Sequence, residues 1–321
     1  MSGWLSSLTS PRFWVGVLLF PLGLYAYLRF TQMLASPTRY KRVHPTAERV
    51  LILGASSGLG RMLARLYAAR GAHVCIVSRR EEQLSTLSKE CGEKCFWVAA
   101  DFSNVGDMVR VRQEIHNKWG GLDSLYVCAG VSAVQPVMRL AGVAPGEDHD
   151  ADSAGIQEAM DVAARATEGN IYGPFLAAVS FIPMLMRTSA SPSILLVSSV
   201  AAVIPAPTRA LYAATKASSL LLFQSLAIEH PTIAFTFILP ATLKGNFRAS
   251  AVDADPATRE AGPNQDGLQL DYVAFRCMDA MDYQQRGNII MPSFPYAIAH
   301  HLYYLWPSYI EKQARRKYNF G

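Results

Sequence analysis

The sequence has few charged residues and no glycosylation signal. Asp, Glu, Lys and Arg together make up 17% of its 321 residues, whereas apolar residues make up 50%. Such a composition supports a large buried core and excludes extensive disorder. No Asn-x-Ser/Thr sequon occurs, and the five cysteines are odd in number and lack the paired spacing of a zinc site. We therefore interpret the cysteines as free thiols in a reducing compartment and predict no metal site.

The basic residues are not gathered into a nucleic-acid-binding surface. The net charge is only +5, and the densest basic clusters lie near the two ends of the chain, beside apolar segments. Basic residues in that position more often face membrane phosphates than nucleic acid. We therefore predict a membrane partner and no nucleic acid. The clusters are Arg39, Lys41 and Arg42 near the start, and Lys312, Arg315, Arg316 and Lys317 at the end.

One long uncharged run, residues 13–28, lies between Arg12 and Arg29. As a helix it would be about 24 Å long, against ~30 Å for the hydrocarbon core of a bilayer. It has neither the basic start nor the small-residue cleavage site of a signal peptide. We interpret it as an uncleaved membrane anchor, spanning or monotopic, rather than as a buried core helix. More basic residues follow the run than precede it, which favours a cytosolic location for the rest of the chain.

Apolar runs and helix-like segments alternate over the rest of the chain. Seven runs show almost no alternation of polar and apolar residues, which is typical of buried parallel strands. The pattern predicts an α/β fold, a Rossmann-type doubly wound parallel sheet of about seven strands. We place this domain at residues 49–295, after an anchor and basic linker (1–48) and before a basic, aromatic-rich segment (296–321). The predicted strands are residues 50–53, 73–77, 96–100, 124–128, 193–197, 233–239 and 288–291, with helices over 61–70, 81–89 and 104–119.

Two stretches interrupt this alternation. Residues 139–155 are acidic and rich in Gly and Ala, but they lack the ligand spacing of a calcium loop, so we interpret them as a solvated surface loop. Residues 241–270 are polar and follow the sixth predicted strand. Ligands bind beyond the carboxyl ends of such strands, so this stretch is either a substrate lid or an ordinary loop.

A glycine-rich turn joins the first predicted strand to the first helix. Glycine there permits a tight turn and lets a pyrophosphate approach backbone N–H groups at the helix start. The strand before it and the helix after it favour a dinucleotide site over a turn without a ligand. The predicted cofactor-binding residues of the turn are Gly54, Ser56, Ser57, Gly58, Leu59 and Gly60.

The end of the second predicted strand indicates which dinucleotide is bound. An NAD site usually carries Asp or Glu there to hold the ribose 2′-hydroxyl, whereas this chain has Ser78, Arg79 and Arg80. A hydroxyl and two guanidiniums suit a 2′-phosphate, so we predict NADP(H) in preference to NAD(H). The alternative is a pair of solvated arginines. Asp101, followed by Phe102 after the third strand, is a candidate to hold the adenine amino group or to cap the next helix.

Tyr212 and Lys216 carry the predicted chemistry. They stand four residues apart, on one face of a helix and one turn from each other. A phenol with a pKa of ~10 is a poor base at neutral pH, but a nearby ammonium favours the phenolate. Lys216 would also hold the nicotinamide ribose. Ser199, at the carboxyl end of the fifth strand, can polarise a substrate carbonyl as charge develops on its oxygen.

Together these residues resemble the short-chain dehydrogenase/reductase family over residues 50–240. The resemblance implies that Ser199, Tyr212 and Lys216 are catalytic and that Asn170 helps to hold a water in the proton relay. It also implies cofactor contacts from Ala129, Gly130 and Pro240, and assembly as a dimer or tetramer through paired helices. The chain departs from the family pattern at Leu53, at Val127-Cys128 in place of two asparagines, at Ala241 in place of glycine, and in having no threonine at position 244.

The anchor and the basic C-terminal segment are similar to those of membrane-bound family members, such as ketosphinganine reductases and hydroxysteroid dehydrogenases. This implies a lipophilic ketone or secondary alcohol as substrate and an internal membrane, such as the endoplasmic reticulum, as location. A packed helix ending in solvated cations is the alternative reading of the C-terminal segment. The competing function is a non-catalytic NADP(H)-binding membrane scaffold or sensor. A serine hydrolase is disfavoured because no Gly-x-Ser-x-Gly turn surrounds Ser199.

Overall fold

The computed structural model describes residues 23–24, 27, 39–144, 146–254 and 266–318. The chain divides into two units, Met1–Thr38 and Arg39–Gly321. The predicted anchor lies in the first unit and almost entirely outside the described residues, so it stays a prediction. The second unit holds the predicted α/β fold.

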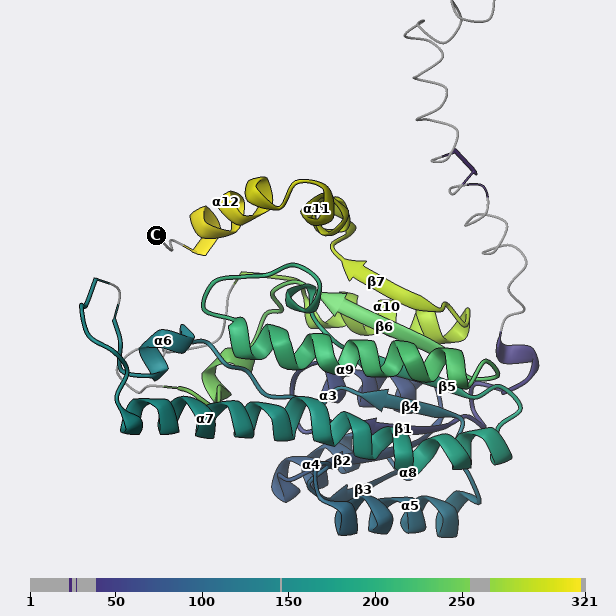
Figure 1. Cartoon of the computed structure of the whole chain (residues 1–321). Coiled ribbons are helices and arrows are strands. Elements are labelled where there is room, and N and C mark those ends of the chain that lie inside the picture. The colour runs from purple at the N-terminus through teal and green to yellow at the C-terminus, as the bar shows by residue number, and fades with distance from the viewer. Residues whose placement is uncertain (1–22, 25–26, 28–38, 145, 255–265, 319–321) are drawn as a thin grey trace, which may run out of the picture. The chain divides into compact units, whose positions relative to one another are not determined.

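A seven-stranded, all-parallel sheet forms the centre of the second unit (Figure 1). Its order, β3-β2-β1-β4-β5-β6-β7, reverses direction between β1 and β4, as in a doubly wound fold. The five inner strands are almost fully buried and the two edge strands are half-buried, which explains the lack of alternation in the sequence. All seven predicted strands are confirmed, as β1 (Arg49–Leu53), β2 (His73–Ser78), β3 (Cys95–Ala99), β4 (Ser124–Val127), β5 (Ser193–Val197), β6 (Ala234–Pro240) and β7 (Gly287–Met291).

Helices cover both faces of the sheet, which gives two hydrophobic cores. On one face lie α3 (Gly58–Ala69), α4 (Glu81–Cys91) and α10 (Leu270–Asp282). On the other lie α5 (Val105–Trp119), α8 (Gly173–Thr188) and α9 (Ala210–Glu229). This three-layer arrangement leaves the carboxyl ends of the strands free to carry a site.

Two helical stretches of the described residues are long and apolar enough to cross a membrane. They are Ser153–Thr188, which joins α7 (Ser153–Thr167) to α8, and Ala210–Glu229, which is α9. Both α8 and α9 contribute buried residues to the core on one face of the sheet. Core helices commonly pass a test of length and composition, so these two stretches are weak support for a membrane location.

A buried ionic network lies at the amino-terminal edge of the sheet. The Arg39 guanidinium pairs with Glu48 and donates to the carbonyl oxygens of Ser191 and Asp123, both at 3.0 Å. Arg70 pairs with Glu48 as well, and its Nη1 lies 2.8 Å from an Asp282 oxygen. Arg39 and Glu48 are at most 2% exposed, so the segment that follows the first unit is fixed to the domain core.

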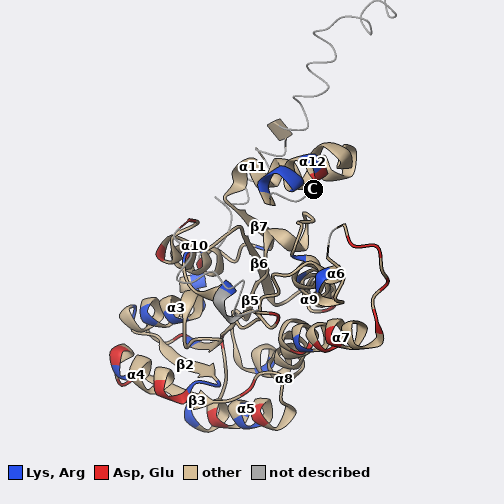
Figure 2. Cartoon of the chain, turned by 90° about the vertical axis from the view of Figure 1, so that its left-hand side faces the viewer, with Lys and Arg blue, Asp and Glu red and all other residues tan. Residues whose placement is uncertain are grey.

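The acidic stretch predicted as a surface loop is confirmed in its central part. Its two ends are helical, because α6 (Val137–Leu140) ends and α7 begins within it. The Asp152 carboxylate caps α7 by accepting a 2.7 Å hydrogen bond from Gly155 N. Between the helices, Glu147, Asp148 and Asp150 are exposed to solvent, as the red segment beside α7 in Figure 2 shows.

Two helices follow the last strand: α11 (Ser293–Leu305) and α12 (Pro307–Tyr318). They pack against each other, and α11 also contacts β7 (Figure 1). Their apolar side chains are mostly exposed, and Ile310 is the one fully buried residue in either helix. The predicted C-terminal segment is therefore helical, with one face turned toward the domain and the other toward the outside.

Candidate active site

A large cavity lies at the carboxyl ends of the strands. Its volume is about 1630 Å³, compared with ~300–1,000 Å³ for most small-molecule sites. It therefore has room for a dinucleotide and a second ligand. Every predicted site residue except Asn170 lines it: Gly54, Ser56, Ser57, Gly58, Leu59, Gly60, Ser78, Arg79, Arg80, Asp101, Phe102, Ala129, Gly130, Ser199, Tyr212, Lys216 and Pro240.

The glycine turn between β1 and α3 is built for close approach. A Cβ on Gly54, whose φ is +87°, would lie 2.6 Å from Ala129 N, and one on Gly60 would lie 2.4 Å from Gly54 O. Gly58 has a φ of +56°, and no atom lies within 4 Å of the position that its Cβ would take. Ser57 precedes α3 without a side-chain cap, so the first N–H groups of the helix are left for a ligand. These features fit a pyrophosphate.

Arg80 spans the gap between β2 and the glycine turn. Its Nη2 donates to Ser56 Oγ at 2.7 Å and to Ser57 Oγ at 2.6 Å. Arg79 is largely exposed and lies 3.6 Å from an Asp101 oxygen. The two arginines therefore differ, because Arg80 is held by hydroxyls at the site of the predicted 2′-phosphate while Arg79 is paired with an acid. Asp101 also accepts hydrogen bonds from Ser103 N and Oγ.

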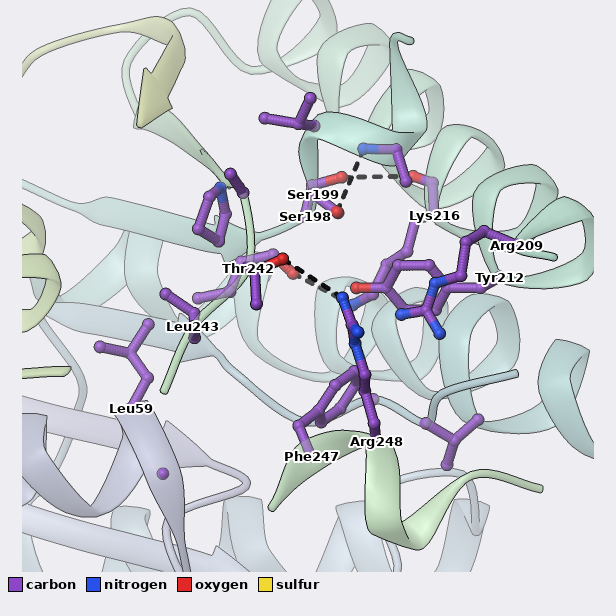
Figure 3. A pocket seen from close by; sticks show the side chains of 18 of the residues that line it. Leu59, Ser198, Ser199, Arg209, Tyr212, Lys216, Thr242, Leu243, Phe247 and Arg248 are labelled. Atoms are coloured by element: carbon purple, nitrogen blue, oxygen red, sulfur yellow. Dashed lines mark hydrogen bonds between the residues drawn. The ribbon is translucent and has the colours of Figure 1, made fainter. Parts of the chain in front are cut away.

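Ser199 and Tyr212 meet at the substrate side of the cavity (Figure 3). Ser199 follows the end of β5, and Tyr212 lies in the first turn of α9. Both side chains line the cavity, and Ser199 Oγ accepts a hydrogen bond from Ala201 N at 3.1 Å. Burial raises the pKa of Tyr212, while the bond from Ser199 and the charges of Arg209 and Arg248 lower it. The phenol is thus neutral at rest but surrounded by groups that stabilise its anion.

Lys216 is buried one turn along the same helix. Its Nζ donates to Val197 O at 3.1 Å, which holds the ammonium against the end of β5. Burial lowers the pKa of Lys216 to about 8, opposed by the nearby Cys128 thiol. Cys128 occupies one of the two positions where the family pattern has asparagine, and burial raises the pKa of its thiol to about 12. The predicted effect of Lys216 on Tyr212 stays a prediction.

Asn170 lies behind the cavity in a single wide helical turn. The turn, η2 (Glu168–Tyr172), is a π-helix between α7 and α8, a feature often found at functional sites. The Asn170 side chain accepts from Val131 N at 2.9 Å and donates to Val131 O at 2.9 Å and Thr215 Oγ1 at 3.0 Å. A Cβ on Gly130 would lie 2.8 Å from Asn170 Oδ1 and 2.9 Å from Lys216 Nζ. Gly130 thus lets these two groups approach each other.

Several cavity residues were not anticipated from the sequence. The Arg209 guanidinium lies over the Tyr212 ring, with Cζ 4.7 Å from the ring centroid, and Phe247 contacts the same ring edge-on at 6.0 Å. Arg248 Nη2 donates to Thr242 Oγ1 at 3.2 Å. Figure 3 shows the Arg248 guanidinium next to the Tyr212 hydroxyl, whereas the Arg209 guanidinium lies against the ring. The polarity of residues 241–270 was the one available signal for Thr242 and Arg248, and the described part of that stretch does line the cavity.

The last two helices supply an apolar wall to the cavity. Ile298 and Leu302 of α11 and Ile310 and Ala314 of α12 line it. The sequence pointed to aromatic and basic residues in this segment but not to a contact with the site. The wall makes the substrate side of the cavity suitable for an apolar ligand.

A family model described as short chain dehydrogenase matches residues 48–255. The chain belongs to the short-chain dehydrogenase family. Membership accounts for the parallel sheet covered by helices, and it confirms the resemblance found in the sequence.

Two of the most similar family members show how far the likeness extends. The chain is 30% identical to 11-beta-hydroxysteroid dehydrogenase-like 4A of Arabidopsis thaliana over 200 residues, or 61% of this chain and 60% of that protein. It is 28% identical to dehydrogenase/reductase SDR family member 7B of Bos taurus over 245 residues, or 73% of this chain and 68% of that protein. The match therefore spans less than two thirds of the plant relative's length.

Solved structures of short-chain dehydrogenases have the same fold. One from Burkholderia phymatum, in complex with NAD, superposes with a TM-score of 0.67 at 18% identity and covers 81% of this chain and 93% of its own. An alcohol dehydrogenase from the archaeon Thermococcus sibiricus, complexed with 5-hydroxy-NADP, has a TM-score of 0.61 at 19% identity, with coverages of 76% and 96%. At these identities the likeness shows the fold alone.

Proposed function

We propose that the protein is an NADP(H)-dependent oxidoreductase that interconverts a lipophilic ketone and a secondary alcohol. The observation that carries this proposal is that Ser199 and Tyr212 line the same cavity as the glycine turn. The pair supplies an acid and a hydrogen-bond donor where a carbonyl would sit beside the nicotinamide. When bound, the nicotinamide ring gives or takes the hydride.

In the direction of reduction, Tyr212 donates its proton to the substrate oxygen. Burial favours the neutral phenol before the reaction. Ser199 donates a hydrogen bond to the same oxygen and stabilises the negative charge that develops there. Arg209 and Arg248 stabilise the phenolate that is left. In the direction of oxidation the phenolate accepts the proton instead.

Lys216 and Asn170 restore the proton of Tyr212. Their side chains lie on either side of Gly130, where a water can bridge an ammonium and an amide. A pKa of about 8 lets Lys216 exchange a proton near neutral pH at little cost. Asn170 is held by three hydrogen bonds and keeps the water in place.

The residues at the other end of the cavity fit an NADP(H) dinucleotide. Gly54, Gly58 and the uncapped start of α3 would hold the pyrophosphate. Arg80, with Ser56 and Ser57, would hold the 2′-phosphate through charge-assisted hydrogen bonds. No Asp or Glu occupies the end of β2, where an NAD site would place one.

The apolar wall of α11 and α12 supports a lipophilic substrate taken from a membrane. On the outer surface of the same helices, Phe294, Leu305 and Trp306 are 57–83% exposed. The last turn of α12 carries Arg315, Arg316 and Lys317, shown in blue in Figure 2, which suit anionic headgroups. We place the domain on the cytosolic face of the endoplasmic reticulum or another internal membrane.

A homodimer would bury a second apolar surface. Phe175, Val179 and Met186 of α8 and Leu221 and Ile228 of α9 are 47–83% exposed, although they belong to the two longest helices that cover the sheet. Self-association through these helices would remove that surface from water. Light scattering on the detergent-solubilised protein should give twice the protomer mass, and a monomer would contradict the assembly.

The activity is tested with the full chain in detergent. NADPH oxidation is followed with sphingoid, steroid, retinoid and fatty ketones, with NADH as the comparison. Turnover of at least one ketone, faster with NADPH, is the expected result. The replacement of the two asparagines by Val127 and Cys128 favours the second candidate, a cofactor-binding scaffold or sensor. Tight NADPH binding without turnover of any ketone would support that candidate instead.

A further inference from the structure

Two arginines, Arg209 and Arg248, lie beside the Tyr212 phenol. Arg209 is 8% exposed and donates to Ser132 Oγ at 3.2 Å and Ala133 O at 3.0 Å. Arg248 is half-buried and donates to Thr242 Oγ1. Neither forms an ion pair with any carboxylate among the described residues. Arg209 lies over the phenol ring and Arg248 beside its hydroxyl, so two like charges lie close together, and burial of a charge without an ion-pair partner, as at Arg209, is costly.

Other arginines of low exposure in this chain form ion pairs with carboxylates. Arg39 pairs with Glu48, Arg49 with Asp123, and Arg70 with both Glu48 and Asp282. Each therefore carries its counter-charge within the fold. Arg80, by contrast, donates to two hydroxyls at the place where the cofactor phosphate is expected. An arginine without a carboxylate partner thus marks a ligand position in this cavity, and Arg209 and Arg248 mark a second one.

Among the residues that the structure describes, the acids near this second position are already hydrogen-bonded or lie elsewhere. Asp253 is buried, but its carboxylate accepts hydrogen bonds from Val134 N and Gln135 N at 2.8–2.9 Å. The acids that line the cavity, Asp101 and Glu168, both lie near Ser103, on the cofactor side. The substrate side is lined by further cations from Lys244 and Lys317. The local charge is therefore positive around Tyr212.

We infer that the substrate carries an anionic group, a carboxylate or a phosphate, close to its reacting carbonyl, and that Arg209 and Arg248 bind it. The inference rests on the proposed function and narrows its substrate class to an amphiphilic oxo-acid. The fork of a guanidinium matches the two oxygens of such an anion. The tail of the substrate lies along Ile298, Leu302 and Ile310, which is the apolar wall of the same cavity.

The test uses matched pairs of ketones that differ only in charge. We would compare 4-oxododecanoate with its methyl ester, and the corresponding phosphonate with its dimethyl ester, as substrates of the full-length protein with NADPH. The acid should have a kcat/KM at least about tenfold above that of its ester, the effect of one charge-assisted hydrogen bond. A comparison of kcat/KM for the carboxylate with kcat/KM for the phosphonate then shows which of the two anions the site binds.

Variants of the two arginines separate substrate binding from an effect on Tyr212. In Arg248→Gln and Arg209→Gln, the ratio of kcat/KM for the acid to kcat/KM for its ester should fall about tenfold or more. Arg165→Gln is the control, since Arg165 also lines the cavity but pairs with Glu158 at 3.5 Å. The Arg165→Gln variant should keep the ratio of the unmodified protein. An equal loss of activity toward acid and ester in Arg248→Gln would mean that the arginine acts on Tyr212 alone, and would overturn the inference.

A binding measurement keeps the inference testable if no ketone turns over. Quenching of NADPH fluorescence, titrated with each acid and each ester, reports binding without chemistry. Tighter binding of an acid, lost in Arg248→Gln, supports the anion site even if the proposed activity fails. Equal binding of acid and ester by the unmodified protein overturns the site, whether or not a neutral ketone is reduced.

Discussion

The guanidinium of Arg209 lies over the ring of Tyr212, with its Cζ 4.7 Å from the ring centroid. Burial raises the pKa of this phenol, and Arg209, Arg248 and Ser199 lower it. Opposed effects of this kind bring the pKa of a group toward the working pH, where the group can both donate and accept a proton. The cation closest to the ring is therefore part of the acid–base system, although nothing in its sequence position marks it.

Arg209→Gln should change the pH profile of alcohol oxidation. That direction requires the phenolate, so kcat/KM rises with pH through the pKa of Tyr212. Loss of a cation that stabilises the phenolate raises this pKa, and the rise in activity should move to higher pH. Profiles of the unmodified protein and of Arg165→Gln, measured in parallel, should coincide. An unmoved profile in Arg209→Gln would show that the guanidinium has no effect on the phenol.

Tyr212→Phe should remove the proton donor and leave the fold intact. The ring keeps its contacts with Arg209 and Phe247, while the hydroxyl is lost. We expect kcat to fall about 10²–10⁴-fold, the usual contribution of general acid catalysis. NADPH affinity, measured by fluorescence, should stay within about twofold. Undiminished turnover would exclude Tyr212 as the acid.

Arg80→Gln should weaken NADPH binding more than NADH binding. Arg80 is held by Ser56 and Ser57, so its charge is fixed at the predicted 2′-phosphate position. Loss of one charge-assisted hydrogen bond should raise the Kd for NADPH about 10- to 100-fold. Arg79→Gln is the matched comparison and should have a smaller effect, because Arg79 is 73% exposed and paired with Asp101. Equal weakening of both cofactors by Arg80→Gln would contradict the phosphate role.

Lys216→Met should stabilise the protein and abolish its activity. The native pKa of Lys216 is about 8, below its ordinary value of 10.5. Between these pH values the unfolded chain binds a proton that the native state has lost, so the free energy of unfolding rises with pH. At pH 7 the buried ammonium destabilises the fold, and its removal should raise that free energy by about 1–3 kcal/mol. Urea titrations at pH 7 and pH 10 test this, and a less stable variant at pH 7 would contradict it.

Glu48→Gln should destabilise the domain without touching the active site. Glu48 neutralises both Arg39 and Arg70 at the amino-terminal edge of the sheet. Removal of one partner from a buried ionic network costs about 3–5 kcal/mol. Arg42→Ala, an exposed change in the same segment, serves as the control in urea unfolding. Equal midpoints for the two variants would mean that the network contributes little to stability.

The sequence predicted features that are local or periodic. The strands could be recognised because parallel strands are buried on both faces, and Tyr212, Lys216 and Ser199 because their spacing follows from one helix and one strand end. Arg209 lies three residues from Tyr212, yet an arginine on a helix is usually solvated, and its burial depends on Ser132 and Ala133. Such contacts join segments about 76 residues apart. They follow from tertiary packing, which no local pattern records.

The wide turn at Glu168–Tyr172 means that the helix carries one residue more than a regular α-helix would need there. If one residue were deleted from α7, the helix could continue without the wide turn. Each residue of an α-helix turns the chain by ~100°, so the deletion would also change the direction in which the following side chains point. Asn170 would then rotate away from Val131 and Thr215, with the sheet, the cavity and every other site residue unchanged. The position of Asn170, and with it the proposed proton relay, therefore depends on the rotation of the helix, and a deletion can remove the relay as completely as a substitution.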